Sequence, residues 1–477
     1  QGMTRPSLFT ARVWRSLPIL LILVLAAALR FRGIADDSLW GDEALSWIIA
    51  RMSFVEMIRH IVWWEQIPPV HHVLLWVWIK LFGASELSLR MPSALAGVGG
   101  VAAMYVFVRR VLGRREAIAA ALIVAVAPLH VAYAQEARTY ALTFLVAIVC
   151  TDLFVRLLRE PTQRLQVAYI IAAAALLYCH LYGVFVLAAH QLAYACARME
   201  KSKPALPLRR WIMTSIAIAA LYSPWVSVVL GWVRAVNVNF WVKAVTWDDV
   251  SRAYWVLVGS TPLYLIAIPL AVLGVVRLWR RHRAAMPLLL GLAFLPVIVP
   301  VAVSILGRPS FAPRYAIVAC VGLYPLIASG VAAIPFGAAR AGLLVLFAAL
   351  AIHAARGEAT AVPKSPWREA VAYVQQRAGP KDIVVIHIGA KKRLYDYYNR
   401  RPELPVRRFD SESLPLVPPI DPGRRVWFIR HEEWALLPAQ IRRGPWHIIS
   451  HKWFGDILVM EMDDQFPPDY EDPGRSR

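Results

Sequence analysis

Charged residues are scarce in this chain, and their scarcity excludes most soluble proteins. Only 17% of the 477 residues are Asp, Glu, Lys or Arg, whereas 58% are hydrophobic, and the mean hydropathy is +0.51. A soluble domain cannot cover that much apolar surface, but a protein with several membrane-spanning helices exposes it to lipid. The composition therefore indicates a polytopic α-helical membrane protein that has membrane lipid as a partner.

Cysteine is also sparse, which argues against a disulfide or metal–thiolate framework. The chain has four cysteines and no CxxC spacing, and all four lie within or at the ends of apolar runs. We interpret them as buried free thiols. Histidines and carboxylates also lack a metal-ligand spacing, so we predict that no cofactor is required. A divalent ion near Glu65, Glu136 and the histidines is left open, without support from the spacing.

The positive charge is distributed in a way that excludes nucleic acid as a partner. The formal net charge is +21, which would suit a basic groove. The arginines instead form short clusters between apolar runs, for example at 109–115, 198–210 and 277–283. Such alternation is typical of the cytoplasmic loops of membrane proteins.

Apolar runs bounded by charge predict about eleven transmembrane helices. They lie at 15–31, 91–108, 116–134, 139–158, 165–180, 183–197, 211–231, 261–279, 285–306, 314–332 and 340–355. With a cytoplasmic N-terminus, the basic clusters all fall on the cytoplasmic side. That orientation places 32–90 and everything after about 356 outside.

We predict two domains. Residues 1–357 form the transmembrane domain, with 32–90 as a structured first outer loop. Inside that loop we expect helices near 43–62 and 68–83 at the membrane interface, since 68–83 is short and opens with two prolines. Residues 358–477 alternate helical and strand patterns, which predicts an extracytoplasmic α/β domain ending in a disordered tail.

Ionisable and aromatic residues gather on the outer side of this predicted topology, and ionisable groups at membrane depth usually mark a functional path. They are Asp42, Glu43, Glu65, His71, His72, Glu136, Arg138, His180, Tyr182, Arg308, Arg314 and Tyr315. Arginine binds phosphate through paired charged hydrogen bonds, and a carboxylate accepts the proton of an attacking hydroxyl. Together they favour a reaction on a lipid with an anionic head group.

Purely structural explanations remain open for each of these residues taken singly. Asp42 and Glu43 also fit helix caps, and His71 and His72 also fit interfacial histidines that only make local hydrogen bonds. Glu136 and Arg138 also fit a structural ion pair, and Arg314 fits a side chain that snorkels to the interface.

The chain resembles a known family in several motifs. They are "WGDEALSW" (40–47), "EQIPPVHHVLLWVW" (65–78), "APLHVAYAQEARTYAL" (127–142), "YCHLYGVF" (178–185) and "PRYAIVAC" (313–320). Over about the first 330 residues they resemble the polyprenyl-phosphate-sugar-dependent glycosyltransferases of the GT-C fold. The most similar branch is the bacterial one, related to protein O-mannosyltransferases and to aminoarabinose transferases of lipid A.

The resemblance implies an inverting glycosyltransferase with a polyprenyl-phosphate-linked donor. Asp42 would be the general base, and Arg314, with Tyr315 or Arg308, would hold the donor phosphate. The implied substrate contacts are Glu43, His71, His72, Glu136, Arg138, His180 and Tyr182. One position departs from the family pattern, because Ile67 stands where relatives often have a basic residue before the paired prolines.

The sequence leaves several acceptors open and also leaves one alternative function. A lipid, a glycan or a protein hydroxyl each fits as acceptor. The expected location is the bacterial inner membrane, multi-pass, with the active site on the periplasmic side. The alternative function is a transporter or flippase for a polyprenyl lipid or glycolipid, but the polar residues lie on one face and no internal repeat is visible.

Overall fold

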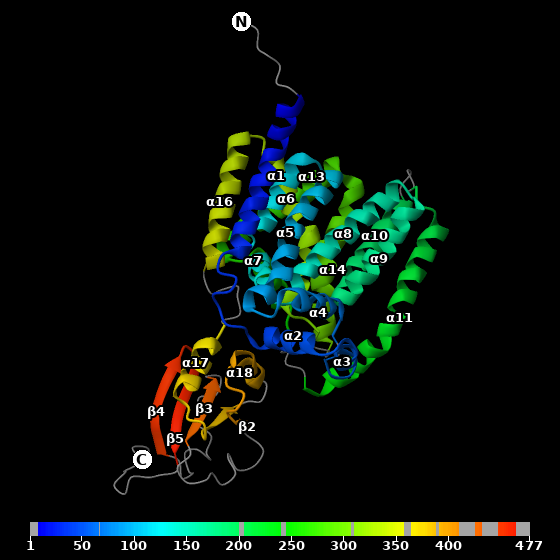
Figure 1. Cartoon of the computed structure of the whole chain (residues 1–477). Coiled ribbons are helices and arrows are strands. Elements are labelled where there is room, and N and C mark those ends of the chain that lie inside the picture. Colours follow the sequence, from blue (N-terminus) through cyan, green and yellow to red (C-terminus); the bar gives the residue numbers. More distant parts are fainter. Residues whose placement is uncertain are drawn as a thin grey trace. The chain divides into compact units, whose positions relative to one another are not determined.

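The chain folds as two compact units. The computed structural model describes residues 8–65, 67–199, 205–239, 245–306, 310–356, 364–387, 391–409, 425–431 and 447–463. We call Gln1–Ile34 with Ile49–Val362 the helical unit, and Ala35–Ile48 with Pro363–Arg477 the α/β unit (Figure 1). The α/β unit thus joins a short segment from near the N-terminus to the C-terminal part of the chain.

The helical unit contains most of the chain's helices. In order they are α1 (Leu8–Phe31), α3 (Phe54–His60), α4 (Val70–Phe82), α5 (Glu86–Val111), α6 (Arg114–Val126), α7 (Pro128–Ala134), α8 (Tyr140–Arg159), α9 (Gln163–Cys179), α10 (Gly183–Met199), α11 (Leu208–Asn239), α12 (Asp248–Val258), α13 (Thr261–Arg281), α14 (Met286–Ile305), α15 (Cys320–Ala333) and α16 (Gly337–Arg356). Helix α2 (Gly41–Arg51) begins in the α/β unit and ends in the helical unit.

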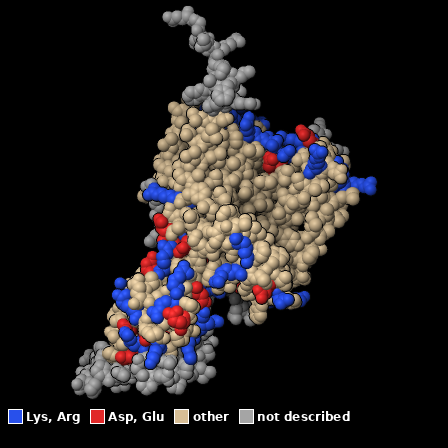
Figure 2. Space-filling view, viewed as in Figure 1, with Lys and Arg blue, Asp and Glu red and all other residues tan. Residues whose placement is uncertain are grey.

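Seven segments are long and apolar enough to cross a bilayer, and the bent α6–α7 pair makes an eighth, among the described residues. Each of the eleven predicted runs lies in helix, but α9, α10 and the described apolar part of α1 are shorter than these seven. The count of eleven and the cytoplasmic N-terminus therefore stay predictions. On the face shown in Figure 2, most of the surface of the helical unit carries no charge, as expected for a multi-pass membrane protein.

Small residues allow α13 and α15 to pack closely. A Cβ added at Gly330 would lie 1.9 Å from the carbonyl oxygen of Leu270, and one at Gly274 would lie 2.0 Å from that of Leu326. Small residues let helix backbones approach each other in a membrane, where apolar burial alone cannot drive association. This contact forms part of the buried core of the helical unit.

A bend between α6 and α7 leads the chain into the candidate site. Pro128 begins α7 and the two helices meet at 57°. The break leaves carbonyls at the end of α6 without partners in the helix. The fully buried guanidinium of Arg30 donates to two of them, those of Ala125 (2.9 Å) and Val124 (3.0 Å).

The segment after α1 is more broken than the sequence analysis predicted. Instead of one helix near 43–62, α2 ends at Arg51 and α3 begins at Phe54, followed by a π-helical turn at Ile61–Glu65. Ser53 starts α3 with a capping box, in which Ser53 and Glu56 each bond the other's backbone N–H. The expected helix at 68–83 is α4.

The α/β unit is a five-stranded sheet with two described helices. Its elements after α2 are α17 (Trp367–Arg377), β1 (Ile383–His387), α18 (Lys392–Tyr398), β2 (Val406–Phe409), β3 (Val426–His431), β4 (His447–Phe454) and β5 (Ile457–Asp463). The strand order is β2-β1-β3-β5-β4, with β1 parallel to β2 and β3 and the remaining pairs antiparallel. The predicted disordered tail lies outside the described residues.

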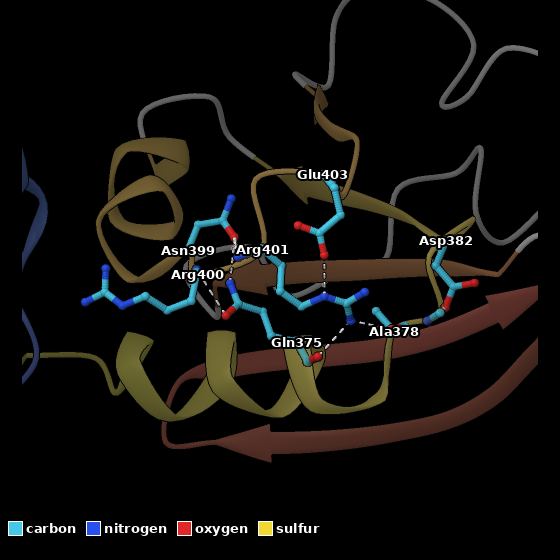
Figure 3. Close-up of polar contacts among 8 residues, drawn as sticks. Gln375, Ala378, Asp382, Asn399, Arg400, Arg401 and Glu403 are labelled. Carbon is cyan, nitrogen blue, oxygen red and sulfur yellow. Dashed lines mark hydrogen bonds and ion pairs between the residues drawn. The ribbon is translucent and has the colours of Figure 1, made fainter.

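Arg401 braces α17 against the loop that follows α18 (Figure 3). Its guanidinium donates to the carbonyl of Gln375 (2.9 Å) and to that of Ala378, at the end of α17, and also bonds Glu403. The Gln375 amide donates to Asn399 at 2.7 Å. These bonds hold the two helices of the α/β unit at a fixed spacing.

Candidate functional site

The turn at 135–139, which connects α7 to α8, is held against the end of α1. The Gln135 amide donates to the carbonyls of Leu29 (3.2 Å), Arg30 (3.3 Å) and Arg32 (2.8 Å). Carbonyls in the last turn of a helix lack partners within the helix, and the two N–H groups of this amide are shared among two of them and the carbonyl that follows α1. The turn is therefore fixed to the point where the chain leaves α1.

Two further helices hold the same turn. Ser93 of α5 donates to the carbonyl of Arg138 at 3.0 Å, and His71 of α4 donates through Nε2 to the carbonyl of Ala137 at 3.1 Å. Burial, and then the Arg138 guanidinium, lower the pKa of His71 to about 4, so this imidazole is neutral near pH 7. His71 thus supports the turn through its backbone.

The turn brings a buried carboxylate and an arginine to one place. Glu136 is only 2% exposed, and Arg138 is partly buried. The charges of Glu136 and Arg314 both act on the Tyr133 hydroxyl, so the three side chains lie near one another. The charges of Arg138 and Arg314 likewise both act on the His180 ring. The structure therefore gathers "QEAR", the turn after α9 and the 313–319 segment at one region of the helical unit.

Tyr315 is the centre of a group that we call the aromatic–arginine cluster: Tyr140, His180, Tyr182, Arg314 and Tyr315. The Tyr315 ring lies 5.2 Å from that of His180, 5.6 Å from that of Tyr182 and 6.4 Å from that of Tyr140. The Arg314 guanidinium carbon lies 5.6 Å from the Tyr315 ring centre. Aromatic faces beside a cation suit a sugar next to a phosphate.

His180 and Tyr182, two of the predicted substrate contacts, take part in hydrogen bonds within the protein. The Tyr182 hydroxyl donates to the Ser310 carbonyl at 2.9 Å, and the Tyr182 backbone N–H donates to His180 Nδ1 at 3.1 Å. The first bond ties the turn after α9 to the residues just before the 3-10 helix at Pro313–Ala319, which carries Arg314 and Tyr315. Arg308, the other predicted phosphate ligand, lies outside the described residues.

Asp42 and Glu43 lie in the α/β unit, in the first turn of α2. Asp42 is half-buried, whereas Glu43 is fully buried. Glu43 Oε2 accepts from the Trp40 backbone N–H at 3.3 Å and lies 3.9 Å from Lys364 Nζ. The helix-capping alternative therefore holds for Glu43, which accepts from an N–H at the start of α2.

His72 packs edge-on against His71, with ring centres 5.3 Å apart, and is 3% exposed. Glu65 lies 3.7 Å from His60 at the end of the π-helical turn. Within the described ranges, no group of three or more His, Cys, Asp or Glu side chains is arranged to hold a metal ion.

A separate pocket lies where α6 begins and α13 ends. It is lined by Leu112, Arg114, Arg115, Glu116, Arg277, Arg281 and His282. Glu116 and Arg277 form a 2.8 Å ion pair in it. None of the predicted site residues lines this pocket, and the α6–α7 span separates it along the chain from the 135–139 turn.

The chain is similar to known proteins in part of its sequence and in its fold. Residues 66–232 match the family described as dolichyl-phosphate-mannose-protein mannosyltransferase. ArnT from Cupriavidus metallidurans, crystallised with undecaprenyl phosphate, aligns with 94% of this chain and 98% of its own, at a TM-score of 0.59 and 14% identity. The chain therefore has the fold of ArnT, the GT-C fold.

Two more similarities extend the comparison. This chain also aligns with the archaeal oligosaccharyltransferase AglB from Archaeoglobus fulgidus, over 84% of this chain and 65% of AglB, at a TM-score of 0.53 and 11% identity. A putative mannosyltransferase of Bacillus subtilis (strain 168), YkcB, is 31% identical over 93 residues. That match covers 20% of this chain and 13% of YkcB's length.

Several residues of the site were missed by sequence reasoning. Tyr140 belongs to it because its ring stacks on that of Tyr315, and Ser93 because it donates a hydrogen bond to the Arg138 carbonyl. Both are residues with a polar group near the end of an apolar helix. Lys364 and Arg368 contact the Asp42 region from more than 300 positions away. Their only sequence signal is a pair of basic residues in "PKSPWREA", just after the last predicted span.

Proposed function

We propose that this protein is an inverting glycosyltransferase that moves a sugar from a polyprenyl-phosphate-linked donor to an acceptor hydroxyl. The observation that carries the proposal is the aromatic–arginine cluster, beside the "QEAR" turn, in a chain with the GT-C fold. An arginine and aromatic faces at helix ends suit a phosphate and a sugar that arrive on a membrane lipid.

In this mechanism, the acceptor oxygen attacks the anomeric carbon from the side opposite the phosphate. The bond between that carbon and the phosphate oxygen breaks, and its electron pair leaves with polyprenyl phosphate. Asp42 accepts the hydroxyl proton. Arg314, with Tyr315 beside it, stabilises the charge that develops on the leaving phosphate.

The local contacts refine the roles predicted for the other residues. We assign Glu136 and Arg138 to the sugar or acceptor, since the turn that holds them is fixed by three side chains. His71, Tyr182 and Glu43 act as supports, because their polar atoms bond backbone or another side chain. The proposed location is the bacterial inner membrane, with a periplasmic active site and a lipid, glycan or protein acceptor.

The test follows the sugar in membranes that contain the protein and a radiolabelled polyprenyl-phosphate sugar. We expect label to leave the polyprenyl fraction and appear on a new acceptor with inverted anomeric configuration, because a single displacement inverts that carbon. A flippase would instead leave the label polyprenyl-linked while changing its leaflet. Label that crosses the membrane without leaving the polyprenyl carrier contradicts the proposed transfer.

A further inference from the structure

The segment that carries Asp42 belongs structurally to the α/β unit. We call Ala35–Ile48 the Asp42 segment. The Arg368 guanidinium, at the start of α17, donates to the carbonyls of Ala35 (3.0 Å), Asp36 (3.2 Å) and Asp37 (3.4 Å). One side chain therefore holds three successive peptide units, which fixes the path of the backbone rather than the position of a single group.

The next two residues are held from two different helices. The backbone N–H of Arg368 donates to Ser38 Oγ at 3.1 Å, so Ser38 satisfies an N–H in the first turn of α17. The Leu39 N–H donates to the hydroxyl of Tyr398, the last residue of α18, at 2.7 Å. Ser38 and Leu39 are both buried.

Asp42 is followed in α2 by a buried charge pair and an aromatic contact. Lys364 Nζ lies 3.9 Å from Glu43 Oε2, and their side chains are only 8% and 0% exposed. On the next turn of α2, the Trp47 ring meets the Tyr397 ring edge-on at 5.0 Å. The first turn of α2 is thus anchored before, beside and after Asp42.

We infer that Lys364, Arg368 and Tyr398 are positioning residues for Asp42, so the C-terminal α/β domain takes part in the chemical step. The inference rests on the proposed base role of Asp42. A general base has to lie within hydrogen-bond reach of the proton that it removes, and a displacement of about 1 Å can cost roughly 100-fold in rate. Since the anchors come from α17, α18 and the segment before α17, the domain sets that position.

A role in stability alone would predict a different pattern. Anchors that only stabilise the fold lower the amount of folded protein and leave the rate per folded molecule unchanged. Anchors that position a base lower that rate while donor binding stays the same, because Asp42 is not a ligand of the donor phosphate in the proposed mechanism.

The main variant is Lys364→Met, with Lys364→Arg as the conservative replacement. We expect Lys364→Met to lower kcat by roughly 10- to 100-fold with donor KM within about twofold, and Lys364→Arg to recover most of the rate. The matched control is Lys392→Met, which removes a more exposed 2.7 Å pair with Asp396 on α18 and should leave kcat unchanged.

Two more conservative substitutions keep the inference testable if Lys364→Met fails to fold. Tyr398→Phe removes only the hydroxyl that accepts from Leu39, and Arg368→Lys removes the forked contact with three carbonyls. Both should lower kcat with donor KM unchanged. Arg377→Lys, at the other end of α17 and stacked on Tyr373 at 3.9 Å, is the control that should not.

The outcomes separate this inference from the proposed function. If the wild-type protein transfers no sugar, or if Asp42→Asn transfers it normally, the proposed function or the base role fails. If Asp42→Asn is inactive but Lys364→Met, Tyr398→Phe and Arg368→Lys all keep wild-type kcat in folded protein, the positioning inference alone is wrong.

Discussion

Asp42 and Arg314, to which we assign the base and the leaving-group contact, are held by different kinds of structure. Around Arg314, the described contacts come from helix ends and turns within the helical unit, through Tyr315, His180 and Tyr182. Around Asp42, the contacts come from Lys364 and Arg368, far along the chain.

The difference predicts that substitutions in the two units affect different steps of the reaction. The aromatic–arginine cluster is built from residues whose identity suits a bound sugar phosphate, and all five of its residues belong to the helical unit. The Asp42 segment owes its backbone path to that domain. Variants of the cluster should therefore change donor binding, whereas variants of the segment and its anchors should change the rate of transfer.

Arg314→Ala sharpens the donor-binding side of this comparison. It should weaken binding of polyprenyl phosphate by roughly 10- to 150-fold, because hydrogen bonds to charged groups contribute about 1.5–3 kcal/mol. Titration of the purified protein in lipid nanodiscs measures this. The control is Arg283→Ala, whose guanidinium stacks on Trp279 at 4.0 Å after the end of α13. Equal affinity of Arg314→Ala and wild type would assign Arg314 to anchoring at the membrane interface.

Gln135→Leu tests the support of the "QEAR" turn with a smaller expected effect. Three carbonyls at the end of α1 lose their side-chain partner, so we expect a loss of about 1–3 kcal/mol in stability and a lower Tm. Thermal unfolding in detergent measures the shift. Gln191→Leu, a more exposed glutamine on α10, should shift Tm less. A Tm shift for Gln135→Leu no larger than that of Gln191→Leu would count against the proposed support.

Much of the helical unit could be predicted from the sequence, because long apolar runs carry their own signal. Each predicted run is helical, and the chain has the GT-C fold that the motifs implied. The break between α2 and α3 was missed, although "SFVE" (53–56) matches the sequence pattern of a capping box. The bend at Pro128 likewise has a local signal in the proline itself.

The anchors of the Asp42 segment could not be predicted in this way. A hydrogen bond from Arg368 to a carbonyl more than 330 residues earlier leaves no pattern in either stretch, since any residue supplies a backbone carbonyl. The role of Lys364 also has no signal in the sequence, because a single basic residue after a predicted span is usually a solvated charge. Glu43 was predicted as a substrate contact, but its burial against Lys364 and its bond from the Trp40 N–H indicate a supporting role.

The most direct test of the account measures donor binding and sugar transfer in one preparation of Asp42→Asn. The substitution keeps the shape of the side chain and removes its ability to accept a proton. We predict that transfer falls by roughly 100- to 10,000-fold, the usual contribution of a general base, while polyprenyl-phosphate binding stays at the wild-type level. Transfer at the wild-type rate by this variant would contradict the assignment of Asp42 as the base.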